Sequence, residues 1–287
     1  MSLLSVNQLL VMLGSDSVAA VSRTIGIRRR ILDQKQAYFP KQIDDLSPET
    51  AVWQRAMMQL DVLIHSMNVK PKSQISITLA SDFVRYLALP PQPVYMSVAE
   101  KLAYAMAAYR EIYGAVVDDW EIRLQDTPMQ DTTIAAAIDK KLFEAISQTA
   151  LKYQLKLITI KPYLMSAFNG LVKEVGSTSG YLVIVEFKRL LLVNLVRGKC
   201  VNVRMIQLGS DWQAELKSLM VRETVLGVSQ NQITSQNNSE KNKQEILVYA
   251  PVQKNIVINP IEGWQVKRIS IKNTLSNYRF AMLEVAL

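Results

Sequence analysis

A run of short apolar segments between residues 180 and 207 constrains the fold more than any other feature. Three stretches rich in aliphatic and β-branched residues, 181–186, 189–196 and 200–207, are separated by short polar breaks. Segments of this length and composition are typical of β-strands joined by tight turns. The sequence therefore predicts three consecutive antiparallel strands here.

A weaker copy of this pattern opens the chain. Its segments are 8–13, 17–23 and 27–35, and they lie about 170 residues before the second set. In both places, further segments with helical and strand periodicity follow. Repetition of this kind predicts a duplicated α/β architecture with mixed sheets. In such folds a ligand is usually bound between the halves, at loops beyond the strand ends.

Composition excludes several classes of protein. No stretch reaches the roughly 18–20 consecutive apolar residues of a membrane-spanning helix. The first residues also lack the basic start and the small-residue cleavage site of a signal peptide. The only cysteine, Cys200, excludes an internal disulfide and fits a reducing compartment, and we expect a buried, unreactive thiol. These features predict a cytoplasmic protein.

The net charge of +8 is spread along the chain, with short concentrations such as 28–30, 188–189 and 267–268. A nucleic-acid module normally gathers basic side chains and exposed aromatic rings on one face. That arrangement is not visible, so we do not expect nucleic-acid binding. Association with an anionic membrane surface, directly or through a membrane partner, fits the charge better.

Two candidate catalytic features have simpler interpretations. His65 could act as a general base, but no Ser, Cys or acid is placed near it by spacing, which favours a half-exposed helical residue. Asp118 and Asp119 could be paired carboxylates, but adjacent acids before a strand usually mark a turn. A single histidine also excludes the common multi-histidine metal sites.

Periodicity predicts helices and strands along the whole chain. The predicted helices are 48–67, 97–113, 139–153, 162–175 and 212–227, and Pro48 fits the first position of the first one. The later strands are 75–79, 83–89, 120–124, 132–138, 155–160, 246–250, 265–271 and 279–286. Residues 229–244 are polar and low in complexity, so we expect a mobile loop.

Several of these stretches resemble one known family. They are Ser81–Pro90, Tyr109–Gly114 with the following Trp120–Leu124, and Lys161–Asn169. Each is similar to a scaffold motif of the cytoplasmic part of type II secretion GspL proteins and of type IV pilus assembly proteins of the PilM type. The resemblance implies an actin-like (ribonuclease H-like) fold made of duplicated halves, with a small inserted α+β subdomain.

On this resemblance the chain divides into four parts. Residues 1–73 would form the first half, 74–138 the inserted subdomain, 139–178 the completion of the first half, and 179–287 the second half.

Actin-like ATPases hold nucleotide at three turns whose glycines let backbone N–H groups approach the phosphates and the adenosine. The first turn here, Gly14-Ser15-Asp16-Ser17, keeps this type. The second reads Glu186-Phe187-Lys188-Arg189, without glycine. At the third, 250–252, Ala-Pro-Val replaces the expected glycines, and Pro251 removes an N–H donor. Two of the three turns have therefore lost the nucleotide-binding pattern.

The resemblance leaves two functions open. In the first, the chain is a scaffold without cofactor that binds the cytoplasmic tail of an inner-membrane assembly protein, with the assembly ATPase as a second candidate partner. It would then lie at the inner membrane only through its partners. In the second, Asp16 and Glu186 share a Mg²⁺ ion and support ATP binding and hydrolysis, with Lys188 near a phosphate. Both acids are also ordinary residues for hairpin turns.

Overall fold

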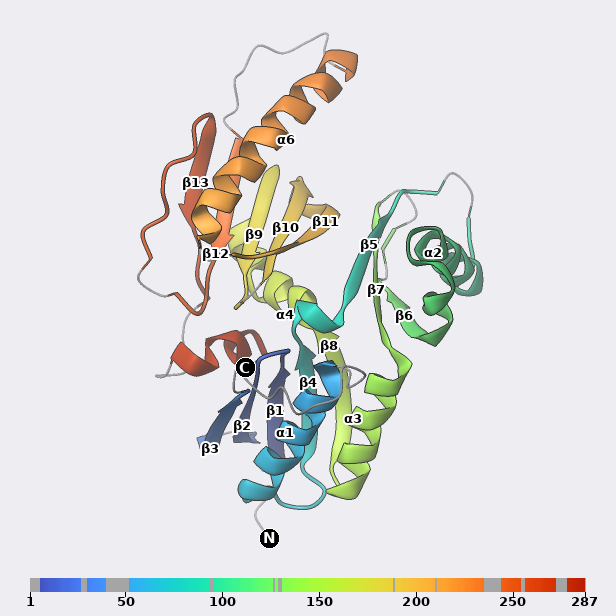
Figure 1. Cartoon of the computed structure of the whole chain (residues 1–287), viewed down its shortest axis with the longest axis vertical. Coiled ribbons are helices and arrows are strands. Elements are labelled where there is room, and N and C mark those ends of the chain that lie inside the picture. Colours follow the sequence, from blue (N-terminus) through green and yellow to red (C-terminus); the bar gives the residue numbers. More distant parts are fainter. Residues whose placement is uncertain are drawn as a thin grey trace. The chain divides into compact units, whose positions relative to one another are not determined.

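The computed structural model describes residues 6–26, 30–39, 52–92, 95–125, 127–128, 131–187, 189–209, 211–234, 244–253, 256–271 and 278–286. The chain consists of two compact units, Met1–Gly170 with Ile271–Leu287, and Leu171–Ser270. Figure 1 shows the helices and strands of each. Within the described ranges, none of the helices has the length and apolar character that a membrane span requires.

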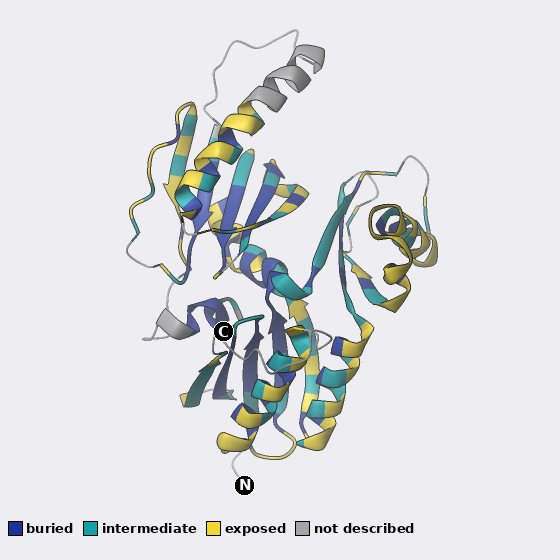
Figure 2. Ribbon diagram, in the orientation of Figure 1, coloured by how far each residue is buried: buried dark blue, intermediate teal, exposed yellow. Residues whose placement is uncertain are grey.

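A five-stranded mixed sheet forms the centre of the first unit. Its order is β3-β2-β1-β4-β8, and β1, β4 and β8 run parallel. The strands are β1 Val6–Leu13, β2 Ser17–Ile25, β3 Arg30–Tyr38, β4 Gln74–Leu79 and β8 Lys156–Pro162. Helices α1 (Val52–Ser66) and α3 (Lys140–Lys152) pack on one face, and the C-terminal segment η3 (Tyr278–Ala286) contacts β1 and β2. The end of β1 is therefore buried on both sides (Figure 2).

The second unit repeats this topology. Its sheet has the order β11-β10-β9-β12-β13, with strands β9 Gly180–Val185, β10 Arg189–Val196, β11 Lys199–Gln207, β12 Gln244–Tyr249 and β13 Trp264–Arg268. Helix α6 (Trp212–Thr234) packs through Trp212, Leu216 and Met220 onto this sheet. In both sheets the first strand is central, the next two lie on one side and the last two on the other. This confirms the predicted duplication.

A small subdomain is inserted between β4 and α3. It has a three-stranded antiparallel sheet in the order β5-β7-β6, with β5 Arg85–Leu89, β6 Trp120–Leu124 and β7 Thr133–Asp139. Helix α2 (Val98–Tyr113) covers one face of this sheet through Ala105 and Tyr109. The remaining elements of the subdomain are η1 Ser81–Phe83 and η2 Gly114–Asp119.

Local chemistry fixes both ends of α2. The Ser97 hydroxyl accepts from the N–H of Glu100, and the Glu100 carboxylate accepts from the N–H of Ser97, which together form a capping box. At the other end Gly114 has a φ of 73°, a conformation that glycine adopts without strain. The predicted helix from residue 97 to 113 is therefore confirmed.

Three predicted boundaries differ from the structure. The second unit begins at Leu171 rather than at residue 179. The insertion does not begin at residue 74, because β4 pairs with β1 and β8 in the large sheet. Residues 271–287 were assigned to the second half, but they belong to the first unit. Tertiary contacts of this kind leave no signal in local periodicity.

Three predicted elements also differ. Residues 279–286 were predicted as a strand but form the 3₁₀ segment η3, in which residues 280–284 are all buried, so burial does not alternate as it does in a strand with one solvent-facing side. The helix predicted at 162–175 is split at Leu171 into α4 (Tyr163–Gly170) and α5 (Val172–Val175). Helix α6 continues to Thr234, so the start of the predicted loop 229–244 is helical; residues 235–243 lie outside the described residues.

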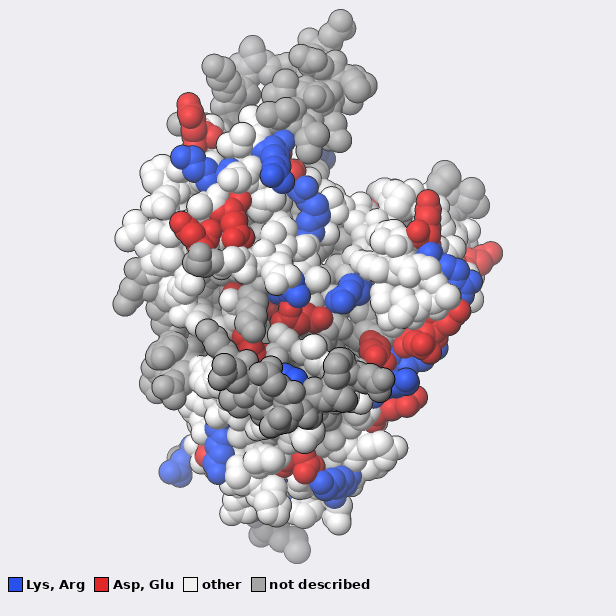
Figure 3. Space-filling view, in the orientation of Figure 1, with Lys and Arg blue, Asp and Glu red and all other residues white. Residues whose placement is uncertain are grey.

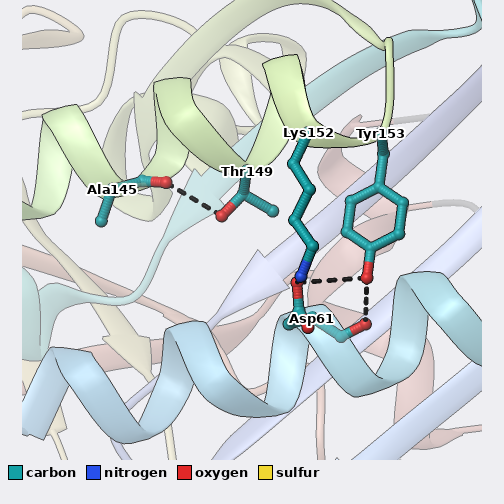
Figure 4. A network of polar contacts seen from close by, with 5 residues as sticks. All are labelled: Asp61, Ala145, Thr149, Lys152 and Tyr153. Atoms are coloured by element: carbon teal, nitrogen blue, oxygen red, sulfur yellow. Dashed lines mark hydrogen bonds and ion pairs between the residues drawn. The ribbon is translucent and has the colours of Figure 1, made fainter.

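A polar contact joins the two helices that cover the large sheet of the first unit (Figure 4). The Lys152 ammonium group lies 2.6 Å from Asp61 Oδ1, and the Tyr153 hydroxyl donates to the carbonyl and carboxylate of Asp61, at 3.0 and 3.1 Å. The hydrogen bond from Lys152 is the main cause that holds the pKa of Asp61 below its usual range. These contacts of Asp61 with Lys152 and Tyr153 link α1 to the end of α3.

We expect Asp61→Asn to lower the melting temperature by no more than about 4 °C, because the pair is exposed and screened by solvent. The folded-state pKa of Asp61 is depressed, so its contribution is present above the ordinary carboxyl pKa and is lost as pH falls through the lowered value. Melting curves of both proteins between neutral and acidic pH should therefore converge below about pH 4. A difference that grows toward acidic pH would contradict this role for Asp61.

Candidate functional site

The turn Gly14-Ser15-Asp16 between β1 and β2 is the predicted first phosphate loop. The N–H of Gly14 donates to the carbonyl of Ser17 at 3.0 Å, and the carbonyl of Asp16 accepts from the N–H of Phe39 at 2.8 Å. A Cβ at Gly14 would lie 3.1 Å from the Ser17 carbonyl oxygen, tighter than an ordinary contact. The Gly14 amide is thus used to close the turn.

Asp82 bonds to this turn, and sequence reasoning missed it. Its Oδ2 accepts a short hydrogen bond from the Ser15 hydroxyl. Asp82 lies in η1, directly after β4, and β4 is parallel to β1 with Leu79 opposite Leu13. Parallel strands end at the same sheet edge, so this pairing could have placed Asp82 beside Ser15. The Ser15 hydroxyl is therefore engaged by a carboxylate.

The second predicted turn follows β9. Glu186 is 5% exposed, and its N–H donates to the carbonyl of Arg189 at 2.8 Å. The next side chain, Phe187, is 41% exposed. Lys188 lies outside the described residues. This turn carries a buried acid where a phosphate loop has glycine.

Asp16 belongs to the first unit and Glu186 to the second. A Mg²⁺ site shared by the two therefore stays a prediction. Among the residues that the structure describes, no group of three or more His, Cys, Asp and Glu side chains is arranged to hold a metal ion.

The third predicted turn, Ala250-Pro251-Val252, is held against the start of α6. The indole N–H of Trp212 donates to Gln253 Oε1 at 2.8 Å, and Arg268 donates to the carbonyls of Gln253 and Ile256. Trp212 is 6% exposed and belongs to the same core as Ala250. A large aromatic ring thus fills the space between this turn and the helix.

The first N–H groups of α6 are also occupied. Asp211 Oδ1 accepts from the N–H groups of Gln213 and Ala214, both at 3.1 Å. A helix N-terminus binds phosphate through such N–H groups. Here the chain's own carboxylate satisfies them.

A groove beside β8 in the first unit has a cavity volume of about 410 Å³. We call it the β8 groove. Its lining is mainly aliphatic and comes from β4, β6, β7, α3, β8 and α4. The lining residues are Leu79, Glu121, Arg123, Leu124, Gln125, Ile134, Ala136, Ile138, Phe143, Leu157, Ile158, Thr159, Ile160, Pro162 and Met165.

Strand β8 contributes to the groove in an unusual way. Four consecutive residues, 157–160, line it, although successive side chains of a strand point to opposite faces. The register of β8 against β4 shifts at Ile158, which has no partner in β4. Leu157 and Thr159 on either side of this bulge both line the cavity, which places it at the edge of the strand. β8 is the last strand of its sheet and pairs only with β4 among the described strands. The groove therefore runs along an open backbone edge.

Strand β7 contributes differently. Only alternate residues, Ile134, Ala136 and Ile138, line the groove, whereas Ala135 and Ala137 pack against α2. The face of β7 that points away from α2 thus forms an apolar wall of the groove. On β6, the Arg123 guanidinium pairs with Glu121 at 2.7 Å and is 78% exposed, which adds charge to the rim.

Other residues of chemical interest are not gathered into a site. His65 is exposed on α1, as the simpler interpretation expected. Asp118 forms an ion pair with Arg110 rather than a carboxylate pair. Burial raises the pKa of the Cys200 thiol to about 12, so the thiol is unreactive at neutral pH.

No protein-family model matches the sequence, and no curated protein matches it. The fold, however, matches solved structures. A chain of the PilM–PilN type IV pilus biogenesis complex aligns with a TM-score of 0.58 and 12% identity, over 99% of this chain and 98% of that one. The cytoplasmic domain of EpsL, an inner-membrane component of the type II secretion system of Vibrio cholerae, aligns with a TM-score of 0.52 and 9% identity, over 98% and 94%.

A third match is a Bacteroides thetaiotaomicron protein with an actin-like ATPase fold and unknown function. Its TM-score is 0.50 at 12% identity, and the alignment covers 84% of this chain and 81% of that one. At such low identities the matches establish the fold alone. The chain has an actin-like ATPase fold, shared with the EpsL cytoplasmic domain and with the PilM–PilN complex.

Proposed function

We propose that this protein is a cytoplasmic scaffold of a type IV pilus or type II secretion-like assembly machine. It binds the cytoplasmic tail of an inner-membrane partner and does not hydrolyse ATP. The observation that carries the proposal is the β8 groove, in which an open strand edge faces an apolar wall. The structural similarity to PilM–PilN and to EpsL is the reason for proposing a pilus or secretion machine.

An extended peptide fits such a groove by adding a strand to β8. Its backbone would pair with the free edge of β8, which supplies affinity with little dependence on sequence. Alternate side chains of the peptide would then lie on the wall formed by Ile134, Ala136 and Ile138, which supplies specificity. Ile158 is 45% exposed at this edge, so a peptide would cover apolar surface that now faces water.

The loop chemistry supports a protein that has lost ATP hydrolysis. The Ser15 hydroxyl donates to Asp82, so a phosphate would have to displace an acid that repels it. In the second unit Trp212 and Gln253 occupy the region of the third turn. The turn after β9 has no glycine that would let its backbone N–H groups approach a phosphate. We infer that each change weakens nucleotide binding independently.

The alternative is a divergent ATPase in which Asp16 and Glu186 share a Mg²⁺ ion. It is favoured by the glycine and acid retained in the first turn. The assembly ATPase of the machine remains a second possible protein partner. In the scaffold proposal, the protein is held at the inner membrane through the tail that it binds.

Titration with Mg²⁺-ATP and Mg²⁺-ADP separates the two functions. A site with micromolar affinity would stabilise the protein by about 4 kcal/mol at a thousandfold excess of ligand. We expect no rise in melting temperature and no heat of binding at millimolar nucleotide. Asp82→Asn is the matched variant for this titration, because it removes the negative charge beside Ser15 while keeping the shape of the side chain. A clear shift in the parent protein that Asp16→Ala abolishes would establish the ATPase alternative instead.

Substitution in the groove tests the peptide site. We expect Ala136→Phe to weaken binding of a labelled tail peptide, taken from the PilN-like protein of the same organism, at least about tenfold, because the added ring fills the wall. Val98→Phe adds the same bulk at a side chain that is 83% exposed on α2 and should leave the affinity unchanged. Fluorescence anisotropy measures both.

A peptide methylated at alternate backbone nitrogens keeps its side chains but loses the donors needed for strand addition. It should bind far more weakly than the parent peptide. Equal affinities of the Ala136→Phe and Val98→Phe variants for the tail peptide would place the docking site elsewhere.

A further inference from the structure

One end of the first unit carries a cluster of basic side chains that the proposed function does not use. The ends of the strands lie level there, because Gln8 of β1 is opposite both Arg23 and Gln74, and Gln74 is opposite Lys156. The turns after α1 and after α3 meet at this end: the N–H of Lys72 donates to the carbonyl of Gln154 at 2.7 Å. We call this surface the basic end; its cations are Arg23, Arg30, Lys70, Lys72, Lys152 and Lys156.

Three of these cations face solvent without a balancing acid. Lys70, Lys72 and Lys156 are exposed, and within the described residues none of them takes part in an ion pair. Lys152 is held by Asp61. Figure 3 shows Lys and Arg atoms on both sides of the lower part of the first unit, with Asp and Glu atoms between them. The basic end therefore has a surplus of positive charge.

The inserted subdomain has the opposite charge. Between residues 80 and 139 the sequence has four basic and nine acidic residues, a net charge of −5 in a chain of net charge +8. The subdomain begins where β4 ends, and the basic end lies where β4 begins. The first unit is thus an electric dipole along its strands, which orients it in the field of a charged surface.

Exposed apolar side chains accompany the cations of the basic end. Val6 and Ile31 are each 37% exposed and Leu32 is 51% exposed, and Ile31 lies opposite Arg23 in the sheet. These side chains are aliphatic. Single-stranded nucleic acid is held by stacking on aromatic rings, whereas a lipid bilayer accepts aliphatic side chains beside basic ones.

We propose that the basic end binds an anionic phospholipid surface directly. Each Lys or Arg close to an anionic leaflet strengthens binding roughly fivefold at physiological ionic strength. The combined contribution of Lys70, Lys72 and Lys156 is on the order of a hundredfold, and salt screens it. The acidic subdomain is then turned away from the membrane.

Co-sedimentation of the full chain with lipid vesicles tests the proposal without any partner peptide. The protein should pellet with vesicles of mixed phosphatidylcholine and phosphatidylglycerol at low salt. It should stay in solution with pure phosphatidylcholine vesicles, or with the mixed vesicles at high salt. The triple variant Lys70→Glu, Lys72→Glu, Lys156→Glu should bind at least about a hundredfold more weakly, because loss of the three positive charges alone accounts for that factor.

A matched variant controls for net charge. Lys101→Glu, Lys141→Glu and Lys217→Glu together change the charge by the same amount at sites outside the basic end, and this variant should still bind the mixed vesicles far more tightly than the first. Unchanged melting curves establish that both variants fold. Equal loss of binding in both variants would overturn the proposal, as would failure of the parent protein to pellet with anionic vesicles. Binding of a single-stranded RNA oligonucleotide without vesicle binding would assign the basic end to nucleic acid.

Discussion

Burial of the central strand on both faces is the constraint on which the first unit depends. In β1, residues 9–13 lie between helices α1 and α3 on one side and η3 on the other. A strand that is buried on both faces has a continuous run of aliphatic residues in its sequence. The segments that cover β1 come from distant parts of the chain, because η3 lies at its C-terminal end. In the second unit β9 takes the same central place, with Val183 and Val185 packed under α6. Everything that bears on function is attached to these two centres as turns, an insertion or an open edge.

The duplicated fold could be predicted because burial of both sheets leaves repeated aliphatic runs in the sequence. Local signals were also sufficient where residues close in the sequence hydrogen-bond to one another, as Ser97 and Glu100 do at the start of α2. The position of β4 and of residues 278–286 could not be predicted, because each depends on a strand distant in the sequence. Phe280 and Leu283 are apolar in any fold, and only contact with β1 and β2 selects η3 over a strand.

In the candidate sites, too, some features could be predicted from the sequence and others could not. The loss of glycine after β9 and β12 is visible in the sequence, because glycine itself is the chemical requirement. The bond between Ser15 and Asp82 was not foreseen, since it depends on β1 and β4 ending together. The β8 groove leaves no signal in local periodicity, because it forms where the edge of one sheet faces the side of another.

The open edge of β8 has a consequence beyond docking. Unpaired strand edges are templates for pairing with any other chain, including a second copy of the same protein. Within the described sheet, β8 ends in Pro162 and carries Lys156 and Lys161, and residues of these types discourage such pairing without abolishing it. A partner tail bound in the groove would therefore prevent β8 from pairing with other chains, and so would oppose aggregation. The amount of functional protein in the cell would then follow the supply of its partner, as mass action requires of any ligand that binds only the folded state.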